Sequence, residues 1–429
     1  MKVYTSKHEL IILANEALSA GGEGEVYNVV SSPDRFKNIC VKIYYQKKRT
    51  PLQEGKIKYM VTNPPSRVDG GGFMIGWPLD YVMDADGKFL GFVMPLAFSG
   101  SKQLITLTST KLSKKLETAW HQRYDRSNGK SALISRMKLI CNIAIPIHIL
   151  HSTGLYVLKD FKPENILITY DGRVTIVDMD SVQISEGTRL LFAGTAATPN
   201  YMPPEYYNQG VGKNPTAPLE KSWDYFAIGV VFYQILFGLH PFVVTPKEPV
   251  DEDSNEIYQS ISQNLFPFGV NNHKIKSYPA LHDKFKVLPQ PFQNLFLRAF
   301  SDNPQTRPGA DEWGKYVHPL VKNIGPISYP PPPPPKSFSQ HDSDNHTNSS
   351  KKTNQQNPPK NYLIAAIIVT VLCGLLGVVA IVYASKVNPA WEKGNFQEAQ
   401  EASGKAKLWT YITVVVGLIC NVLFLLLSQ

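Results

Sequence analysis

The sequence predicts an α+β fold of two lobes, a small β-rich lobe over residues 10–97 and a larger helical lobe over residues 98–323. A Pro-rich and polar linker over 324–361 and a two-helix membrane region over 362–428 complete the predicted division. Three observations lead to it: short β-branched runs early in the chain, apolar residues at helical spacing later, and an abrupt change of composition near Tyr329.

The bulk properties exclude several classes of protein. The formal net charge of +9 over 429 residues comes without a block of basic and aromatic residues, so no nucleic-acid partner is expected. The four cysteines are too far apart for a CxxC metal site and too few for a disulfide framework. The first residues lack the apolar core of a signal peptide, which places the front of the chain in the cytosol.

Four runs in the first lobe have the β-branched and aromatic content of strands. An Asp-Ala-Asp-Gly sequence that ends at Gly87 separates the last two runs and predicts a turn. The lobe is therefore expected to be built mainly of strands. The runs are VYNVV (26–30), NICVKIYY (38–45), GWPLDYVM (76–83) and FLGFVMPL (89–96).

Two stretches predict the main helices of the second lobe. Residues 135–154 have apolar residues at helical spacing and end at Gly154, a residue favoured just beyond a helix. Residues 222–238, SWDYFAIGVVFYQILFG, are almost wholly apolar, which predicts a buried helix.

Beyond the second lobe the chain changes character. The run Pro330 to Pro335 favours an extended polyproline segment, and the polar tract after it cannot bury enough apolar surface to fold. Two apolar segments, 362–384 and 408–427, contain no charged residue and are each close to the ~20 residues that span a bilayer. We therefore expect a disordered linker and two membrane helices.

Several polar residues stand out in the two lobes. SAGGEGEV (19–26) places Gly21 and Gly24 in a turn before a β-branched run, where glycine lets backbone N–H groups approach phosphate oxygens. Plain hairpins share this feature, and the P-loop signature is absent. Lys42 follows on a predicted strand, and Glu54 on a predicted helix is placed to hold it. The stretch 158–180, LKDFKPENILITYDGRVTIVDMD, then supplies Asp160, Lys162, Asn165 and Asp178.

Taken in order, these signals resemble the protein kinase family. SAGGEGEV resembles its glycine-rich loop with Ser19 in place of the first glycine, CVKI its lysine strand, LKDFKPEN its catalytic loop and DMD its metal-binding motif. The resemblance covers about residues 10–320 and implies a two-lobe kinase-like fold. MPPE, WDYFAIG and NPQTRP match three further motifs at Glu205, Asp224 and Arg307, which imply a buried Glu205–Arg307 ion pair and a cap by Asp224 on the catalytic loop.

The resemblance implies transfer of the ATP γ-phosphate to protein Ser or Thr hydroxyls, since the DxKPEN form is typical of Ser/Thr kinases. Asp160 would accept the hydroxyl proton and Lys162 would steady the γ-phosphate. Phosphoryl transfer has a loose transition state, so positioning and charge neutralisation carry most of the catalysis.

The remaining site residues would bind ATP and its metal. Lys42 would pair with the α and β phosphates, with Glu54 orienting it. Asn165 and Asp178 would hold Mg²⁺, or alternatively Mn²⁺, because hard cations prefer oxygen ligands. The cofactor-binding set implied by the resemblance is Gly21, Gly24, Val26, Lys42 and Glu54.

The chain also departs from the kinase pattern. Leu158 and Lys159 replace the His and Arg of the catalytic loop, while Met179 and Asp180 replace the Phe and Gly of the metal-binding motif. These changes bear on regulation and leave open a pseudokinase scaffold that binds nucleotide or partners without turnover. Ser181, Thr195 and Thr198 lie where kinases often phosphorylate themselves, although plain loop hydroxyls are the alternative.

The tail resembles the interferon-induced transmembrane, or dispanin, family. The resemblance rests on YASKVN (383–388) and on a following stretch, and it covers about residues 362–427. It implies a membrane lipid bilayer as partner and suggests homo-oligomerisation through the tail. The matching residues of the following stretch are Gly394, Ala399, Ala402, Ser403, Lys405, Ala406 and Lys407.

The topology of the tail has two solutions. Two full spans would place the loop 385–407 outside, yet its four lysines favour the cytosol. In the second solution the first segment is re-entrant, bent at Gly374 and Gly377, and only the second segment spans the membrane. This solution keeps both the loop and the kinase-like lobes in the cytosol. We expect a cell-membrane protein, either multi-pass or re-entrant with a single span, whose kinase-like lobes are cytoplasmic.

Overall fold

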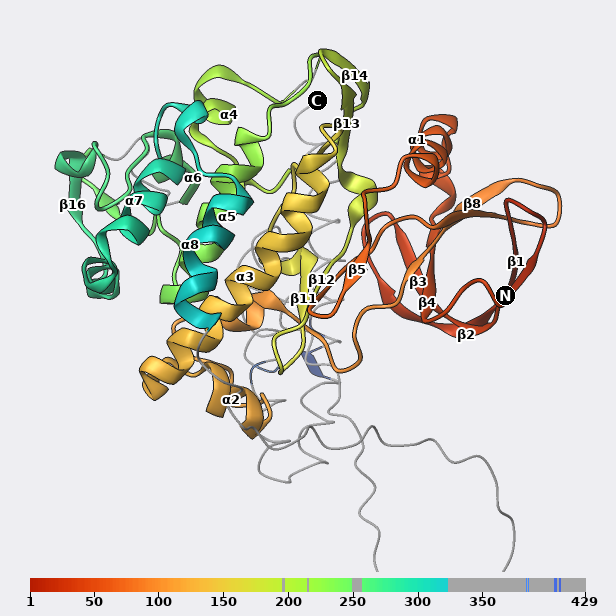
Figure 1. Cartoon of the computed structure of the whole chain (residues 1–429), viewed down its shortest axis with the longest axis horizontal. Helices are drawn as coiled ribbons and strands as arrows, with labels where there is room; N and C mark the ends of the chain where they lie inside the picture. Colours follow the sequence, from red (N-terminus) through yellow and green to blue (C-terminus); the bar gives the residue numbers. More distant parts are fainter. Residues whose placement is uncertain are drawn as a thin grey trace, which may run out of the picture. The chain divides into compact units, whose positions relative to one another are not determined.

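The computed structural model describes residues 1–194, 197–213, 216–248 and 257–322, together with five residues of the tail, Tyr383, Ser385, Lys405, Ala406 and Trp409. The chain divides into two compact units, Met1–Pro335 and Lys336–Gln429. The first unit contains the two lobes (Figure 1). The predicted linker lies outside the described residues, as do the two predicted membrane helices apart from Tyr383 and Trp409.

The N-terminal lobe is a closed β-barrel, drawn in red and orange in Figure 1. All four predicted strands are confirmed within it. A strand at the very start of the chain also joins the barrel, so the lobe begins before residue 10. The barrel strands, in spatial order, are β1 (Lys2–Thr5), β2 (Leu10–Ala20), β3 (Gly24–Ser31), β4 (Ile39–Tyr44), β8 (Phe89–Pro95) and β7 (Asp80–Met83).

Helix α1 (Pro51–Thr62) follows the barrel strand β4. Thr50 caps its start by accepting a hydrogen bond from the backbone N–H of Gln53, and Pro51 occupies the first helical position, where a missing N–H costs nothing. Lys56, Ile57 and Met60 form its buried face. One charged side chain is therefore buried on this helix along with two apolar ones.

The helical lobe is built around α3 (Lys130–Ser152) and α5 (Ser222–Phe237), which confirm the two predicted helices. Helix α3 packs against α5 and α8 (Ala310–Lys322). Within the described residues α3 is long and apolar enough to cross a membrane, but 67% of its most apolar window is buried inside the protein. Such burial is that of a core helix.

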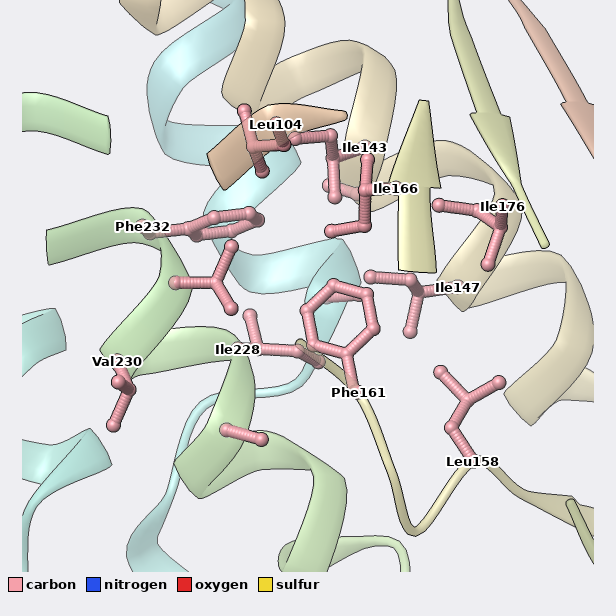
Figure 2. Packing of buried hydrophobic residues seen from close by; sticks show 14 of the residues in the cluster. Leu104, Ile143, Ile147, Leu158, Phe161, Ile166, Ile176, Ile228, Val230 and Phe232 are labelled. Carbon is pink, nitrogen blue, oxygen red and sulfur yellow. The ribbon is translucent and has the colours of Figure 1, made fainter. Parts of the chain in front are cut away.

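The catalytic-loop region stands on this apolar core. Figure 2 shows Leu158 and Phe161 turned into a cluster with Ile147 of α3 and Ile228 of α5. Leu158 and Phe161 are 3% and 2% exposed, so they anchor the loop to the apolar core. The polar residues between and after these two anchors are left to face the site.

Short strands pair segments of the two lobes with each other and also pair loop segments within the helical lobe. Strand β6 (Phe73–Ile75) pairs in parallel with β12 (Val174–Ile176), which sits two residues before Asp178. The other strands are β5 (Asp69–Gly70), β9 (Lys102–Gln103), β10 (Tyr156–Val157), β11 (Ile166–Ile168), β13 (Gln183–Glu186), β14 (Arg189–Phe192), β15 (Thr245–Pro246) and β16 (Ile275–Ser277).

The remaining helices are short. Four are α-helices, namely α2 (Thr118–Tyr124), α4 (Pro204–Gln209), α6 (Ile257–Ser262) and α7 (Gln290–Ala299). The described 3-10 helices are η1 (Gln46–Lys48), η2 (Leu104–Leu107), η3 (Arg126–Asn128), η4 (Pro163–Asn165), η5 (Met179–Ser181), η6 (Pro199–Tyr201), η7 (Asn272–Lys274), η8 (Ala280–Val287) and η9 (Pro304–Thr306).

Candidate active site

Asp224 fixes the backbone of the loop that carries Asp160. Its carboxylate accepts hydrogen bonds from the backbone N–H groups of Leu158, at 2.7 Å, and Lys159, at 2.9 Å. His151 Nε2 lies 2.8 Å from the same carboxylate. These contacts confirm the expected cap, and they hold Lys159 in a left-handed conformation, with φ 61°, that non-glycine residues rarely adopt.

Asp160 lies between a hydroxyl and an ammonium group. Its Oδ1 accepts a 2.6 Å hydrogen bond from Thr198 Oγ1, and its Oδ2 lies 2.8 Å from Lys162 Nζ. Lys162 Nζ also donates to Thr198 Oγ1 at 2.8 Å, which closes a three-residue cluster. The structure thus brings together the predicted base and the predicted phosphate-binding lysine.

Asn165 adjoins both Asp160 and the strand that leads to Asp178. Its side-chain amide donates to the backbone carbonyl of Asp160 at 3.0 Å, and its backbone carbonyl accepts from the N–H of Val177 at 2.9 Å. Within the described residues, Asn165 Oδ1 and Asp178 Oδ2 accept no hydrogen bond. Two such oxygens suit a hard cation, although no cluster of three His, Cys, Asp or Glu side chains in the described part could hold a metal by itself.

Lys42 reaches from β4 to the segment that follows β12. Its Nζ lies 3.1 Å from Asp178 Oδ1 and 2.7 Å from Asp180 Oδ2. Burial alone would lower the pKa of Lys42, but the attraction of Asp180 and Asp178 raises it above its ordinary value. Burial likewise works to raise the pKa of Asp180, and Lys42 outweighs it, so the Asp180 pKa is lowered. Lys42 is therefore a fixed cation next to Asp178.

Glu54 is not brought to Lys42. It pairs instead with Lys58, one turn along α1, at 2.6 Å, and both side chains are substantially exposed. The charged residue on the buried side of α1 is Lys56, whose Nζ donates to the backbone carbonyl of Asp180 at 2.6 Å. Burial lowers the pKa of Lys56 to about 8. The expected orienting role of Glu54 is thus absent from the structure, because this side chain points away from the site.

The glycine-rich turn joins β2 and β3. A Cβ on Gly24 would lie 2.2 Å from the carbonyl oxygen of Ile43, so the approach of β3 to β4 requires glycine there. Gly21 N–H bonds to the Gly24 carbonyl at 2.9 Å and closes the turn. Val26 stands opposite Lys42 in the strand register. The turn and Lys42 are therefore neighbours, as the predicted phosphate-binding arrangement needs.

Comparison with known proteins agrees with this geometry. The family model described as "Protein kinase domain" matches residues 108–318. The chain contains a protein kinase domain. A second family model, "Interferon-induced transmembrane protein", matches residues 358–424, so the kinase domain is followed by a segment of the dispanin type.

Curated relatives of the kinase domain come from bacteria, fungi, plants and mammals. The chain is 25% identical to "Protein kinase YegI" of Escherichia coli K12 over 73% of this chain and 45% of that protein. It is 27% identical to "Serine/threonine protein kinase ypkA" of Aspergillus fumigatus over 51% of this chain and 30% of that protein. It is 29% identical to "3-phosphoinositide-dependent protein kinase 1" of Arabidopsis thaliana over 41% of this chain and 32% of that protein. The chain thus spans less than half the length of these relatives.

Another strong interaction in the kinase domain lies outside the site. Arg307 makes a bidentate ion pair with Glu205, with N to O distances of 2.7 and 2.9 Å. The Arg307 side chain is fully buried and that of Glu205 is 13% exposed. The expected ion pair is confirmed, and it holds the start of α4 against the 3-10 helix η9.

The segment between Asp178 and Glu205 of the kinase domain is tied down at several points. Lys159 Nζ donates to the backbone carbonyl of Gly194 at 2.8 Å. Strands β13 and β14 form a hairpin that contacts α1, where Tyr59 donates to Glu186 at 2.7 Å. Ser181 donates its hydroxyl to the Asp178 carbonyl, while Thr195 lies outside the described residues.

Sequence reasoning did not assign four groups that the structure places in the site. From the sequence, Asp180 is only a departure within the metal-binding motif, and Tyr44, the residue after CVKI, has no role; in the structure Tyr44 donates its hydroxyl to Asp180 beside Lys42. Lys56 belongs to no motif, and only its position on the buried side of α1 indicates a role in the site. The sequence predicts that Thr198 is either a site of self-phosphorylation or a plain loop hydroxyl, and in the structure this hydroxyl donates a hydrogen bond to Asp160.

Proposed function

We propose that the chain is a membrane-anchored Ser/Thr protein kinase that transfers the γ-phosphate of ATP to hydroxyls of neighbouring proteins and of its own copies. The observation that carries the proposal is the contact between Asp160 and Thr198. A carboxylate that accepts a 2.6 Å hydrogen bond from an aliphatic hydroxyl has the geometry of a base acting on Ser or Thr.

The residues around Asp160 fit this reaction. The substrate hydroxyl oxygen would attack the γ-phosphorus, its proton would pass to Asp160, and the bond to the β-phosphate oxygen of ADP would break. Lys162, 2.8 Å from Asp160, is placed to neutralise charge on the transferred group. Lys42 would bind the α and β phosphates beneath the turn that holds Gly21, Gly24 and Val26.

Within the described residues one side-chain oxygen of Asn165 and one of Asp178 accept no hydrogen bond, and these two side chains, with the ATP phosphates, would hold Mg²⁺ or Mn²⁺. When bound, the ion would offset the negative charge of the phosphates. Asn165 is kept in place by its bond to the Asp160 carbonyl, and Asp178 by Lys42.

The dispanin-type segment supports membrane attachment of the kinase domain. With the predicted lobes over 10–97 and 98–323, the linker 324–361 would give a reach of about 31–37 Å if it behaves as a flexible coil. The kinase domain would face the cytoplasm and act on proteins at the membrane surface. Association through residues 362–428 would bring copies together for phosphorylation of one by another.

The test is a phosphorylation assay on the full chain in lipid vesicles, with radiolabelled ATP, Mg²⁺ and a generic protein substrate. Label should appear on Ser or Thr and should fall to background in Asp160→Ala and Asp178→Ala. Asp171→Ala is the matched control, because Asp171 is 45% exposed and pairs only with its neighbour Arg173 among the ion pairs of the described residues. Equal labelling in all variants, or label on tyrosine alone, contradicts the proposal.

The pseudokinase alternative has one observation in its favour. The ammonium of Lys42 is already paired with Asp178 and Asp180, so ATP phosphates must share it. A wild-type chain that binds ATP but leaves no label in the same assay would establish this alternative.

A further inference from the structure

Asp180 holds the ammonium group of Lys42, which also contacts Asp178. Both carboxylate oxygens of Asp180 accept from Lys42 Nζ, at 2.8 and 2.7 Å, and the Asp180 side chain is fully buried. We propose that Asp180 is the positioning residue that aims Lys42 at the nucleotide phosphates, a role that the sequence assigned to Glu54 on α1. This inference rests on the proposed binding of ATP at Lys42.

Helix α1 offers no other acid for this purpose. Glu54 is the only Asp or Glu of α1, and it pairs with Lys58 on the exposed side. Residues two apart on a helix point to nearly opposite sides, so the side that faces the site carries Lys56. A lysine there cannot anchor another lysine, and it bonds to the Asp180 carbonyl instead.

Tyr44 and Lys56 fix Asp180 itself, and Gln53 supports Tyr44. Tyr44 donates its hydroxyl to Asp180 Oδ2 at 2.5 Å, and Gln53 of α1 donates to the Tyr44 oxygen at 2.7 Å. Lys56 holds the backbone of Asp180 from the same helix. Helix α1 therefore still controls Lys42, but through hydrogen bonds to Asp180 rather than through an acid of its own.

The competing carboxylates are less suited to anchoring. Glu23 lies 4.0 Å from Lys42 and its side chain is 28% exposed, so it contributes little. Asp178 contacts Lys42 with one oxygen at 3.1 Å and keeps 35% of its side chain exposed. The buried Asp180 carboxylate is thus occupied by Lys42 and Tyr44, while the more exposed Asp178 keeps an oxygen for the metal.

The test measures the Kd for ATP with Mg²⁺, and the KM and kcat of phosphate transfer, on the full chain in vesicles. Asp180→Asn should raise Kd and KM about 10- to 100-fold, since a hydrogen-bonded charge is lost, with kcat at saturating ATP nearly unchanged because the loss affects ground and transition states alike. Glu54→Gln removes one negative charge from α1, as Asp180→Asn does from the site, and it should change neither Kd nor KM. Melting temperatures show whether each variant folds.

A rescue variant covers the case in which Asp180→Asn does not fold. Asp180→Gly with Lys56→Glu moves the carboxylate onto α1 and should recover most of the ATP affinity. Equal constants for Asp180→Asn and Glu54→Gln, or a double variant that folds without recovering affinity, overturn the inference while leaving kinase activity standing. Binding of ATP that depends on Asp180 without any transfer supports the inference and refutes the proposed function. Absence of ATP binding by the wild type refutes both.

Discussion

The hydroxyl of Thr198 donates a 2.6 Å hydrogen bond to the carboxylate of Asp160, from a segment 38 residues further along the chain. The same hydroxyl accepts from Lys162 at 2.8 Å. One threonine therefore binds both residues that the sequence assigns to catalysis. The position of the catalytic loop and that of the segment before Glu205 are set together.

Replacing Thr198 should affect catalysis through Asp160 and Lys162. Thr198→Val keeps the shape but removes the hydroxyl, and it should lower kcat about tenfold or more because a hydrogen bond to a charged group is worth ~1.5–3 kcal/mol. Thr198→Ser keeps the hydroxyl and should retain most of the activity. Steady-state kinetics on peptide substrate checks both variants, and equal rates for Val and Ser would contradict this role.

Breaking the buried ion pair should cost far more stability than breaking its exposed counterpart. Arg307→Met should lower the free energy of unfolding by about 3–5 kcal/mol, since it strands the Glu205 carboxylate. Arg298 pairs with Glu312 at a similar 2.8 Å but is 44% exposed, so Arg298→Met should cost no more than about 1 kcal/mol. Urea unfolding of the full chain in detergent measures both, and similar losses would argue against the difference in burial as the cause.

The glycine-rich turn provides a matched pair of substitutions. Gly24→Ala should destabilise the chain by about 1–3 kcal/mol, because its Cβ would meet backbone atoms of β4 that cannot move away cheaply. Gly22→Ala should change stability by less than about 0.5 kcal/mol, since a Cβ there has nothing within 4 Å. Thermal unfolding would reveal the difference, and an inert Gly24→Ala would show that the strands can separate.

The buried Lys56 should make stability depend on pH in the alkaline range. Its pKa is about 8 in the folded chain and 10.5 when unperturbed, so between these values the unfolded chain holds a proton that the folded chain has lost. The free energy of unfolding should therefore rise with pH there, by about 1.4 kcal/mol per unit at most. Lys56→Met should remove this rise. Unfolding at several values between pH 8 and 9.5 tests it, and parallel curves for the two proteins would exclude a lowered Lys56 pKa.

Much of the site is predictable because its residues are close in sequence. Asp160, Lys162 and Asn165 occupy one short loop. The apolar residues Leu158, just before it, and Phe161, within it, are buried and fix which side chains face the site. The buried helices were equally readable, because α3 and α5 carry long apolar stretches. The tail helices are predicted from apolar length and from motif, and they lie outside the described residues apart from Tyr383 and Trp409.

The partner of Lys42 was harder to predict, for a physical reason. An acid on α1 at Glu54 and one after β12 at Asp180 are equally plausible from sequence, and the choice depends on how α1 is rotated about its axis. Since Ile57 and Met60 turn inward, Lys56 follows them and Glu54 faces solvent. That rotation is set by packing against the barrel and cannot be read from a helix with a weakly amphipathic sequence.

The hydrogen bond from Lys159 to the Gly194 carbonyl has a consequence for how activity would be regulated. Because a lysine already binds this loop through a main-chain oxygen, the loop needs no phosphate group to hold it in place. A phosphatase would then have no phosphate to remove at this position. On the proposed function, this enzyme would lack an on-off switch at that point. The strength of its output would then follow its abundance and how often substrates arrive within reach of the bilayer.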